Sequence, residues 1–192
     1  MAIPINIEDL LNKRKIESNR IEFKKGWNPD KIYRTICAFA NDFDNIGGGY
    51  IVVGIEEEER TGIAKRPVTG VPIEALNDIQ KDMVGYNNKI EPYYMPRIDV
   101  QEVDGKSVLV IWAPAGVNRP YNVRERVTAK QSPSKWYIRS GTSTIEAKGE
   151  VLDELREMAN RTPFDERGNE RIEISDISPA LVLDYLQTVG SR

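Results

Sequence analysis

The stretch G-G-G-Y-I-V-V-G-I-E, residues 47–56, decides the fold. The run from Tyr50 to Ile55 is apolar and rich in β-branched side chains, which is typical of a strand covered on both faces. Residues 56–60 are all charged, so the strand must leave the core at that point. We therefore expect residues 50–55 to form the central strand of a sheet.

Two helices and a strand are predicted before this central strand. Residues 21–24, I-E-F-K, alternate apolar and charged side chains, the pattern of a half-buried strand in which Ile21 and Phe23 face the core. A short helix is predicted at residues 7–14. Residues 28–30, N-P-D, begin a second helix, with Asn as the cap and Pro at the first position. Apolar residues recur along this second helix at helical spacing, namely Ile32, Ile36, Phe39 and Phe43.

A helix and a hairpin are predicted after the central strand. The helix spans residues 73–86 and has the pattern of one buried stripe. The hairpin joins strands at 97–103 and 106–112 through Asp104 and Gly105, the dipeptide favoured in tight type I′ turns. The residues expected to form the buried stripe of the helix are Ile73, Leu76, Ile79 and Met83.

The remainder of the chain is expected to contain a long loop, a strand and two helices. Residues 113–134 are rich in Pro, Gly and Arg and should form the loop, and residues 136–139 should form the strand. A helix is predicted at 149–160, and a last helix is predicted at 178–190 after a polar tail. Together these elements predict an α/β domain of the mixed α+β kind, with a central mixed sheet and flanking helices.

Composition limits the class of protein. A chain of 192 residues with 40% apolar side chains can bury one substantial core and carry a short appendage. No apolar run approaches the roughly 20 residues that span a bilayer, and the N-terminus lacks the features of a signal peptide. The single cysteine, Cys37, lies among apolar residues and fits a reduced compartment as a core side chain. We therefore expect a cytoplasmic protein with no membrane partner.

Two kinds of chemistry are excluded by what the sequence lacks. Histidine is absent, which rules out the usual serine and cysteine hydrolases, histidine-ligated zinc sites and histidine general bases. No phosphate loop of the G-x-x-x-x-G-K-S/T type is present, and the glycines at 47–49 precede a strand instead of following one. ATP is therefore not expected to bind this segment in either of those ways.

Charge is distributed unevenly along the chain. The net charge is −3, but residues 13–25 and 115–141 are predominantly basic, and the segment after Glu146 is strongly acidic. A basic face of this kind favours phosphate binding, because binding depends on the local potential more than on the total charge. The alternative is that these residues are scattered, solvated charges.

Glu17 and Glu22 form the first candidate constellation. A separation of five residues brings two side chains together only if the backbone turns between them, for which Ser18 and Asn19 are suitable. An acidic residue at the end of the central strand, Glu56 or its neighbour Glu57, could then complete a three-carboxylate cluster.

Such an oxygen-rich cluster would suit Mg²⁺ or Mn²⁺ and could activate water without histidine, with Lys24 near the scissile phosphate. The alternative is that Glu22 and Lys24 form an ion pair on a solvated sheet face, which would contribute little to stability. The spacing alone leaves both interpretations open.

A second constellation combines R-P-Y at residues 119–121 with W-Y-I-R-S-G-T at residues 136–142. Basic side chains interleaved with aromatic rings can contact phosphates and stack on unpaired bases. The alternative is that the aromatic residues belong to the core.

Taken in order along the chain, the motifs resemble the AlbA-like domain of the Schlafen group. The resemblance covers about residues 14–159 and rests on E-S-N-R-I-E-F-K, I-C-A-F-A-N-D, G-G-G-Y-I-V-V-G-I-E, the D-G hairpin, R-P-Y and W-Y-I-R-S-G-T-S-T. It implies a mixed α/β nucleic-acid-binding domain at residues 1–161. Residues 162–192 would then be a polar linker and a helix leading toward a further C-terminal region, such as an ATPase region.

Bacterial and archaeal members of this group are described as transcriptional regulators or as ATP-dependent DNA helicase RecG-related proteins. The resemblance therefore implies a regulatory module that binds DNA or RNA. The residues expected to contact the nucleic acid are Lys24, Lys25, Arg119, Tyr121, Lys135 and Arg139.

Vertebrate relatives in the same group include endoribonucleases that act on tRNA and rRNA through three carboxylates. By motif match two of these correspond to Glu17 and Glu22, and Glu56 stands where the family usually has the third, an Asp. A divalent-metal-dependent endoribonuclease that uses Glu17, Glu22 and Glu56 as catalytic and metal-binding residues is the alternative function. Because the vertebrate enzymes use two such lobes, a single copy would need to form a homodimer or another homo-oligomer. A third possibility is a dimerisation or docking platform for the ATPase region.

Overall fold

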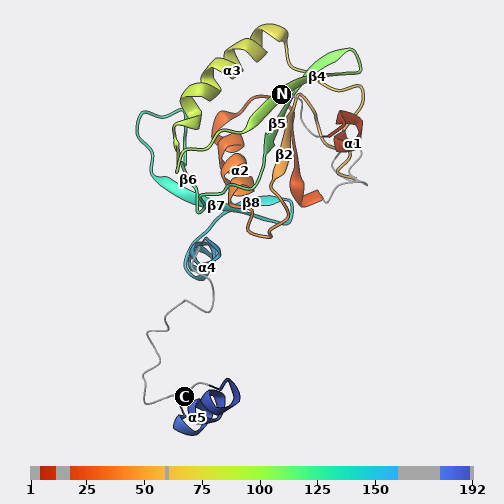
Figure 1. The fold of residues 1–192 in the computed structure, drawn as a ribbon. Helices are drawn as coiled ribbons and strands as arrows, with labels where there is room; N and C mark the ends of the chain where they lie inside the picture. Colours follow the sequence, from red (N-terminus) through yellow and green to blue (C-terminus); the bar gives the residue numbers. More distant parts are fainter. Residues whose placement is uncertain (1–4, 12–17, 59–60, 160–177, 191–192) are drawn as a thin grey trace. The chain divides into compact units, whose positions relative to one another are not determined.

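A computed structural model gives the structure of residues 5–11, 18–58, 61–159 and 178–190. The chain divides into two compact units, Met1–Ala159 and Asn160–Arg192. In the described part of the second unit the regular element is one helix, α5 (Pro179–Thr188). All described strands belong to the first unit, which has the mixed α+β fold that the sequence predicts (Figure 1).

The first sheet contains the predicted central strand. It consists of β1 (Ile21–Lys24), β2 (Gly49–Val53), β4 (Arg97–Val103) and β5 (Lys106–Ala113), in the order β1-β2-β5-β4. Strands β1 and β2 are parallel, whereas β5 is antiparallel to both of its neighbours, so the sheet is mixed as expected. Every residue of β2 is buried.

Close packing explains why glycines precede the central strand. A Cβ atom at Gly49 would lie 2.3 Å from the Phe39 ring, and one at Gly48 would lie 2.2 Å from the Ala113 carbonyl oxygen. Gly48 also has a φ of +79°, which side chains of other residues disfavour. The G-G-G run therefore allows a helix and the end of β5 to approach the start of β2.

The D-G hairpin is confirmed. Strands β4 and β5 pair in register up to Val103 opposite Lys106. Asp104 and Gly105 have φ values of 51° and 71°, both positive as a type I′ turn requires.

A second, antiparallel sheet lies on the other side of the helix that begins at Pro29. It consists of β3 (Ile90–Glu91), β6 (Asn122–Arg124), β7 (Ser134–Ser140) and β8 (Ser143–Glu146), paired in that order. The expectation of one long loop at residues 113–134 was wrong, because β6 forms inside it and pairs with β7. The strand predicted at residues 136–139 is confirmed as part of β7.

Helix α2 (Pro29–Asn41) packs between the two sheets (Figure 1). Its predicted start is confirmed, because the Asn28 side chain accepts a 3.1 Å hydrogen bond from the Lys31 amide and Pro29 follows it. Phe43 lies beyond the helix end and is only partly buried, so its predicted place on the helix was wrong.

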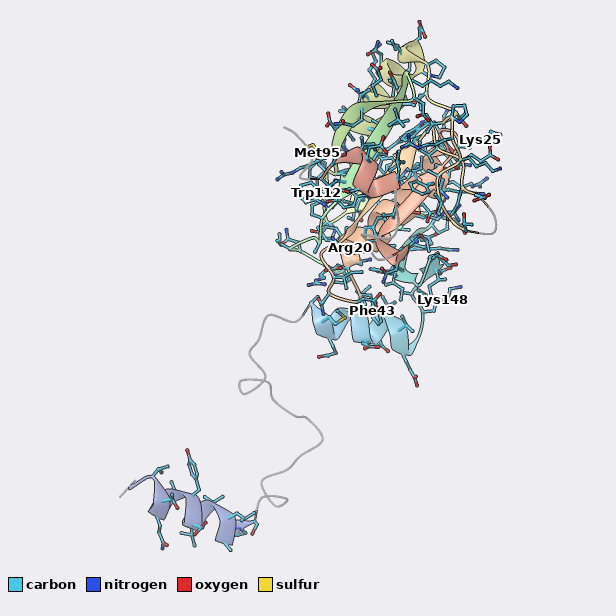
Figure 2. All side chains as sticks on the ribbon, turned by 90° about the vertical axis from the view of Figure 1, so that its right-hand side faces the viewer. Arg20, Lys25, Phe43, Met95, Trp112 and Lys148 are labelled. Carbon is cyan, nitrogen blue, oxygen red and sulfur yellow. The ribbon has the colours of Figure 1, made fainter. Side chains whose placement is uncertain are left out.

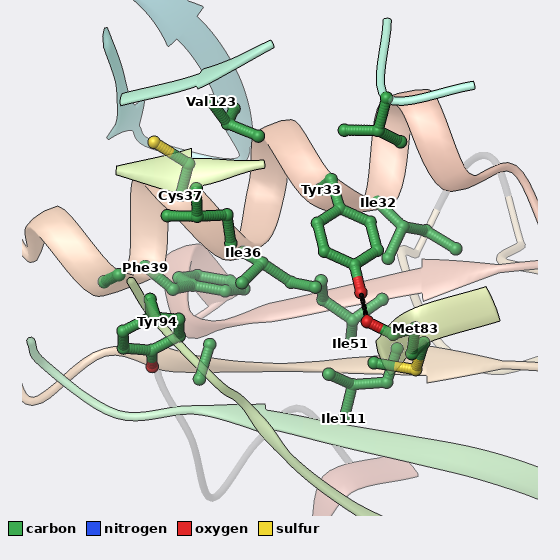
Figure 3. Close-up of a cluster of buried hydrophobic side chains, with 14 of the residues drawn as sticks. Ile32, Tyr33, Ile36, Cys37, Phe39, Ile51, Met83, Tyr94, Ile111 and Val123 are labelled. Carbon is green, nitrogen blue, oxygen red and sulfur yellow. Dashed lines mark hydrogen bonds between the residues drawn. The ribbon is translucent and has the colours of Figure 1, made fainter. Parts of the chain in front are cut away.

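The main core lies between α2, the first sheet and α3 (Ile73–Asn87). Figure 3 shows the α2 side chains meeting Ile51 and Ile111 of the first sheet and Met83 of α3. The Tyr33 hydroxyl donates hydrogen bonds to the Met83 carbonyl at 3.1 Å and to Asn87 Oδ1 at 2.8 Å. Of the stripe predicted on α3, the first residue, Ile73, is 66% exposed, so its assignment to the core was wrong.

Two further helices cover outer faces of the sheets. Helix α1 (Ile7–Leu11) packs Leu10 and Leu11 against the first sheet, and the rest of the helix predicted at 7–14 lies outside the described residues. Helix α4 (Glu150–Met158) packs Leu155 against Ile138 of β7. Within the described residues, no helix combines the length and the apolar character needed to cross a membrane.

Candidate functional site

The I-C-A-F-A-N-D motif at the end of α2 joins the separate motifs of the chain. The Asn41 amide donates to the carbonyl oxygens of Tyr121 at 2.9 Å and Tyr137 at 2.8 Å, and its Oδ1 accepts from the Tyr121 amide at 2.6 Å. Asn41 is fully buried. This side chain therefore ties the R-P-Y segment and strand β7 to helix α2.

Asp42 fixes the glycine run in the same way. Its Oδ1 atom accepts 3.0 Å hydrogen bonds from the amides of Ile46, Gly47 and Gly48. Arg119 donates from Nη1 to the carbonyl oxygens of Asn41 at 3.1 Å and Asp42 at 3.0 Å. Arg119 thus binds the carbonyl groups at the C-terminal end of α2, where cations are favoured.

A cavity of about 350 Å³ lies where β1, the first half of α2 and the β7–β8 hairpin meet. We call it the cationic pocket. Three of its lining side chains are cations, one is a carboxylate and the other five carry hydroxyl groups. The lining residues are Glu22, Lys24, Lys31, Arg34, Thr35, Tyr137, Thr142, Ser143 and Thr144.

Glu22 is the carboxylate of the cationic pocket. It alternates with Ile21 and Phe23, which are buried as predicted, so it lies on the opposite face of β1. One carboxylate oxygen lies 2.5 Å from Lys24 Nζ and the other lies 3.1 Å from Arg139 Nη1. The pair with Lys24 predicted as the simple alternative is therefore present, but a buried arginine joins it.

Arg139 is buried and makes contacts with several segments of the chain. Its side chain is 6% exposed, and its guanidinium donates to the Thr142 carbonyl at 2.7 Å and to Thr144 Oγ1 at 2.8 Å. The guanidinium also donates to the Asn19 carbonyl at 3.3 Å and lies over the Phe39 ring at 5.1 Å. Arg139 therefore connects the β7–β8 turn to the start of β1 and binds Glu22 of the pocket.

The other two cations of the pocket come from α2. Lys31 is exposed. Arg34 is half-buried, and the Arg34 Nε atom donates a hydrogen bond to the Asp30 carbonyl oxygen at 3.1 Å. No salt bridge of either side chain to a described residue is found. With three cations and one carboxylate, the lining side chains carry a net charge of +2. The local potential therefore favours an anion although the whole chain is negative.

Lys31, Arg34 and Thr35 are site residues that the sequence analysis missed. Arg34 and Thr35 stand three and four positions after Lys31 on α2, so the three residues share one helix face. Thr35 Oγ1 lies 3.1 Å from Thr144 Oγ1, which connects that face to β8. The polar face of an amphipathic helix that follows the strand of Glu22 and Lys24 was the signal that could have identified them.

Of the three carboxylates expected to form a metal site, the described residues include two, Glu22 and Glu56, which pair with different cations. Glu17 lies outside those residues. Glu56 pairs with Lys25 at 3.2 Å and with Lys65 at 3.0 Å, and the hydrogen bond from Lys65 is the main cause that lowers the pKa of Glu56. In the described part of the chain, no group of three acidic, cysteine or histidine residues could hold a metal ion.

The position of Glu56 follows from the strand register. Glu22 lies opposite Ile51 in the parallel β1–β2 pair, and the Gly54 amide donates to the Lys24 carbonyl at the end of β1. Glu56 therefore stands past that end, beside Lys25, which extends from the domain surface (Figure 2).

Two further residues expected to bind nucleic acid, Tyr121 and Lys135, make contacts within the protein instead. Tyr121 is 2% exposed and its ring packs against Tyr94, so it offers no face on which a base could stack. Lys135 bridges Glu125 at 2.7 Å and Glu146 at 3.2 Å, and the hydrogen bond to Glu125 is the main cause that raises the pKa of Lys135. Lys24 is therefore the one residue of the six that lines the cationic pocket.

Comparison with known proteins gives one family match. The family model described as Schlafen, AlbA_2 matches residues 17–148. None of the curated proteins matches this chain.

Two solved structures are similar to the chain. One is the DIP2311 protein from Corynebacterium diphtheriae, with 18% identity and a TM-score of 0.51 over 94% of this chain. The chain spans 37% of that protein, so the similarity shows the fold of a part of it. The other is the N-terminal domain of an ATP-dependent DNA helicase RecG-related protein from Nitrosomonas europaea. It has 26% identity and a TM-score of 0.48, and the match covers 70% of this chain and 88% of that domain.

Proposed function

Because this chain belongs to the Schlafen, AlbA_2 family, we propose that its first unit binds nucleic acid, DNA or RNA, through the cationic pocket. The observation that carries the proposal is the convergence of Lys24, Lys31 and Arg34 on one cavity with a single carboxylate. Cations directed at one cavity attract the phosphate backbone, which supplies most of the affinity of non-specific nucleic-acid binding.

Within the pocket, Lys31 and Arg34 are the principal phosphate contacts. They have no salt bridge to a described residue, whereas the charge of Lys24 is offset by Glu22 at 2.5 Å. An arginine can also bind a phosphate through two parallel hydrogen bonds. The hydroxyl groups of the β7–β8 turn add neutral donors that can reach phosphate oxygens or sugars.

The other five residues predicted from the sequence to contact nucleic acid have different roles in this proposal. Arg139 positions Glu22 and the turn, and Arg119 and Tyr121 hold the R-P-Y segment on α2. Lys135 contributes less to binding than the α2 cations, because two carboxylates already neutralise it. Lys25 is the exposed cation beside the pocket strand and adds a weaker contact, since it shares Glu56 with Lys65.

At the level of the whole protein we propose a regulatory role. The N. europaea relative is an ATP-dependent DNA helicase RecG-related protein, and its N-terminal domain is the part that this chain matches. The domain that the sequence assigns to residues 1–161 would bind nucleic acid for a transcriptional regulator or a helicase-related protein, and residues 162–192 would lead into its next region. The buried, free thiol of Cys37 supports a reduced, cytoplasmic location.

A binding assay with a matched control tests the proposal. In a fluorescence anisotropy titration with labelled single-stranded and duplex oligonucleotides, the double variant Lys31→Gln/Arg34→Gln should lose affinity. At about 0.1 M monovalent salt, the loss of two phosphate contacts corresponds to a roughly 60-fold lower affinity for duplex and a roughly 25-fold lower affinity for single strands, because each released counterion contributes a factor of about 8 or about 5. The control is Lys81→Gln/Arg156→Gln, which removes the same charges from exposed positions on α3 and α4. Equal loss in both double variants, or no binding by the wild-type protein, would refute the proposal.

A divalent-metal-dependent endoribonuclease is the second candidate function. Glu22 favours it, because this carboxylate lines the pocket in which a phosphate would lie. The described donors do not fit a metal ion as they stand, since Glu22 is bound by Lys24 and Arg139 and Glu56 by Lys25 and Lys65. Mg²⁺ or Mn²⁺ binding would therefore require Glu17 and a rearrangement of these ion pairs.

Incubation of structured RNA with the protein and Mn²⁺ separates the two candidate functions. The endoribonuclease predicts discrete fragments from the wild-type protein and none from Glu22→Gln, which keeps the shape of the side chain. Fragments that appear equally with both proteins would eliminate the endoribonuclease and leave nucleic-acid binding untouched.

A further inference from the structure

Strand β4 leaves one edge of the first sheet open. It pairs with β5 on one side, and no described strand pairs with its other side. The Val100 amide shows which groups point outward, because it donates to Asp99 Oδ1 of its own strand at 3.1 Å instead of to β5. Since outward groups alternate along an antiparallel strand, Ile98, Val100 and Glu102 present their N–H and C=O groups to the open side.

An apolar surface lies beside this open edge. A groove of about 480 Å³ runs between α3 and β4, and its apolar lining is Met83, Val84, Met95, Pro96 and Ile98. Val84 is 69% exposed, Met95, labelled in Figure 2, is 63% exposed and Val100 is 39% exposed. Apolar side chains concentrated next to an unpaired strand edge mark an interaction surface.

We propose that a second copy of this chain covers this edge, with the two β4 strands pairing antiparallel around a two-fold axis at Val100. This inference is independent of the proposed nucleic-acid binding, because it rests on the opposite edge of the sheet. In this register Val100 lies opposite the partner's Val100, and Ile98 lies opposite the partner's Glu102. Each of these residues directs its backbone groups outward, so the ladder is complete from Ile98 to Glu102.

Side-chain complementarity selects this register. Asp99 lies opposite the partner's Gln101, and these two side chains already form a hydrogen bond with each other within one strand. A register centred on Ile98 would place Val100 opposite the partner's Pro96, which has no N–H group to donate. A register centred on Asp99 would place the two Asp99 carboxylates opposite each other, which is unfavourable because like charges repel.

The consequence for the molecule is a continuous sheet of two domains. In the order β1-β2-β5-β4, the edge strand β4 is farthest from β1, which carries Glu22 and Lys24 of the cationic pocket. Pairing through β4 therefore leaves both pockets uncovered, at the two ends of one assembly. A long anion could then engage both pockets, which raises the apparent affinity without any new contact.

Sedimentation of the 192-residue chain tests whether the copies associate through β4. At micromolar concentration the wild-type protein should sediment at twice the monomer mass of 21.8 kDa. Val100→Lys should restore the monomer, because it places two ammonium groups opposite each other. The control Val117→Lys, at an apolar position that is 78% exposed outside β4, should remain a dimer. A monomeric wild-type protein, or a dimeric Val100→Lys variant, would overturn the proposal.

A cysteine variant tests the register itself. In the proposed dimer the two Val100 Cα atoms lie about 5.5 Å apart, within the roughly 4.4–6.8 Å that a disulfide requires. Val100→Cys should therefore form a disulfide-linked dimer under mild oxidation, and the wild-type protein should not, because Cys37 is buried. Glu102→Cys should not cross-link, since its two copies are displaced by about 13 Å along the strands. Cross-linking of Glu102→Cys in place of Val100→Cys would overturn the proposed register.

Discussion

Replacement of Arg139 by methionine should destabilise the domain strongly, although this arginine comes from a segment that the sequence assigned to nucleic-acid contact. The variant keeps an unbranched apolar stem over Phe39 but removes the guanidinium that binds Glu22, Thr142 and Thr144. Removing one partner of a buried ion pair costs about 3–5 kcal/mol. Because Glu22 is 19% exposed and keeps Lys24, we expect the low end, about 3 kcal/mol of unfolding free energy.

Urea denaturation followed by tryptophan fluorescence and circular dichroism measures this loss. With a typical slope of about 1–3 kcal/mol/M, a loss of about 3 kcal/mol lowers the midpoint by roughly 1–3 M. Arg156→Met is a matched control, because Arg156 also binds a carboxylate and lies over an aromatic ring but is 54% exposed. The control should lose no more than about 1 kcal/mol. If the two variants lose the same free energy, Arg139 does not hold the pocket together as the contacts indicate.

Two further predictions concern the buried groups of α2. Asn41→Leu should lower the unfolding free energy by on the order of 3 kcal/mol, because it removes the Asn41 hydrogen bonds of the buried Tyr121 amide and of the Tyr137 carbonyl oxygen, while the Tyr121 carbonyl oxygen keeps only the Cys37 thiol. A loss below about 1 kcal/mol in urea denaturation would contradict this role. Burial raises the pKa of the Cys37 thiol from 9.0 to about 12, so the folded protein should not react with a thiol reagent at neutral pH and should react fully once unfolded. Since the folded-state pKa is the higher one, the contribution of this thiol to stability is complete below the unfolded-state pKa. It is lost as the pH rises toward 12, and a Cys37→Ala variant should lack this part of the alkaline pH dependence of unfolding.

The fold was predictable where local pattern and tertiary environment agree. The buried run at Tyr50, the alternation of Ile21 and Phe23, the Asn28 cap and the Asp104–Gly105 turn each specify an element through short-range chemistry. Strand β6 escaped prediction because its three residues form a strand only by pairing with β3 and β7. Ile73 fits the apolar stripe of α3 by spacing, but it stands in the first turn of the helix and remains exposed.

The candidate site was predictable only in part, because it is assembled from distant segments. The sequence identified Glu22 and Lys24, which share a strand face. It did not identify Lys31 and Arg34, because their relevance depends on how α2 faces the β7–β8 hairpin. Tyr121 illustrates the opposite case, since an aromatic residue beside basic ones suits both a base-stacking surface and a core. The close approach of Gly116, where a Cβ would lie 2.1 Å from the Tyr121 ring, places it in the core.

The salt dependence of nucleic-acid affinity tests the central claim most directly. For a duplex, each phosphate contact contributes about 0.9 to the slope of log affinity against log salt concentration, and for a single strand about 0.7. If Lys31 and Arg34 each neutralise one phosphate, the slope for Lys31→Gln/Arg34→Gln should be shallower than that of the wild-type protein by about 1.8 on duplex or about 1.4 on single strands. A slope that is the same for both proteins would show that the cationic pocket does not bind the phosphate backbone.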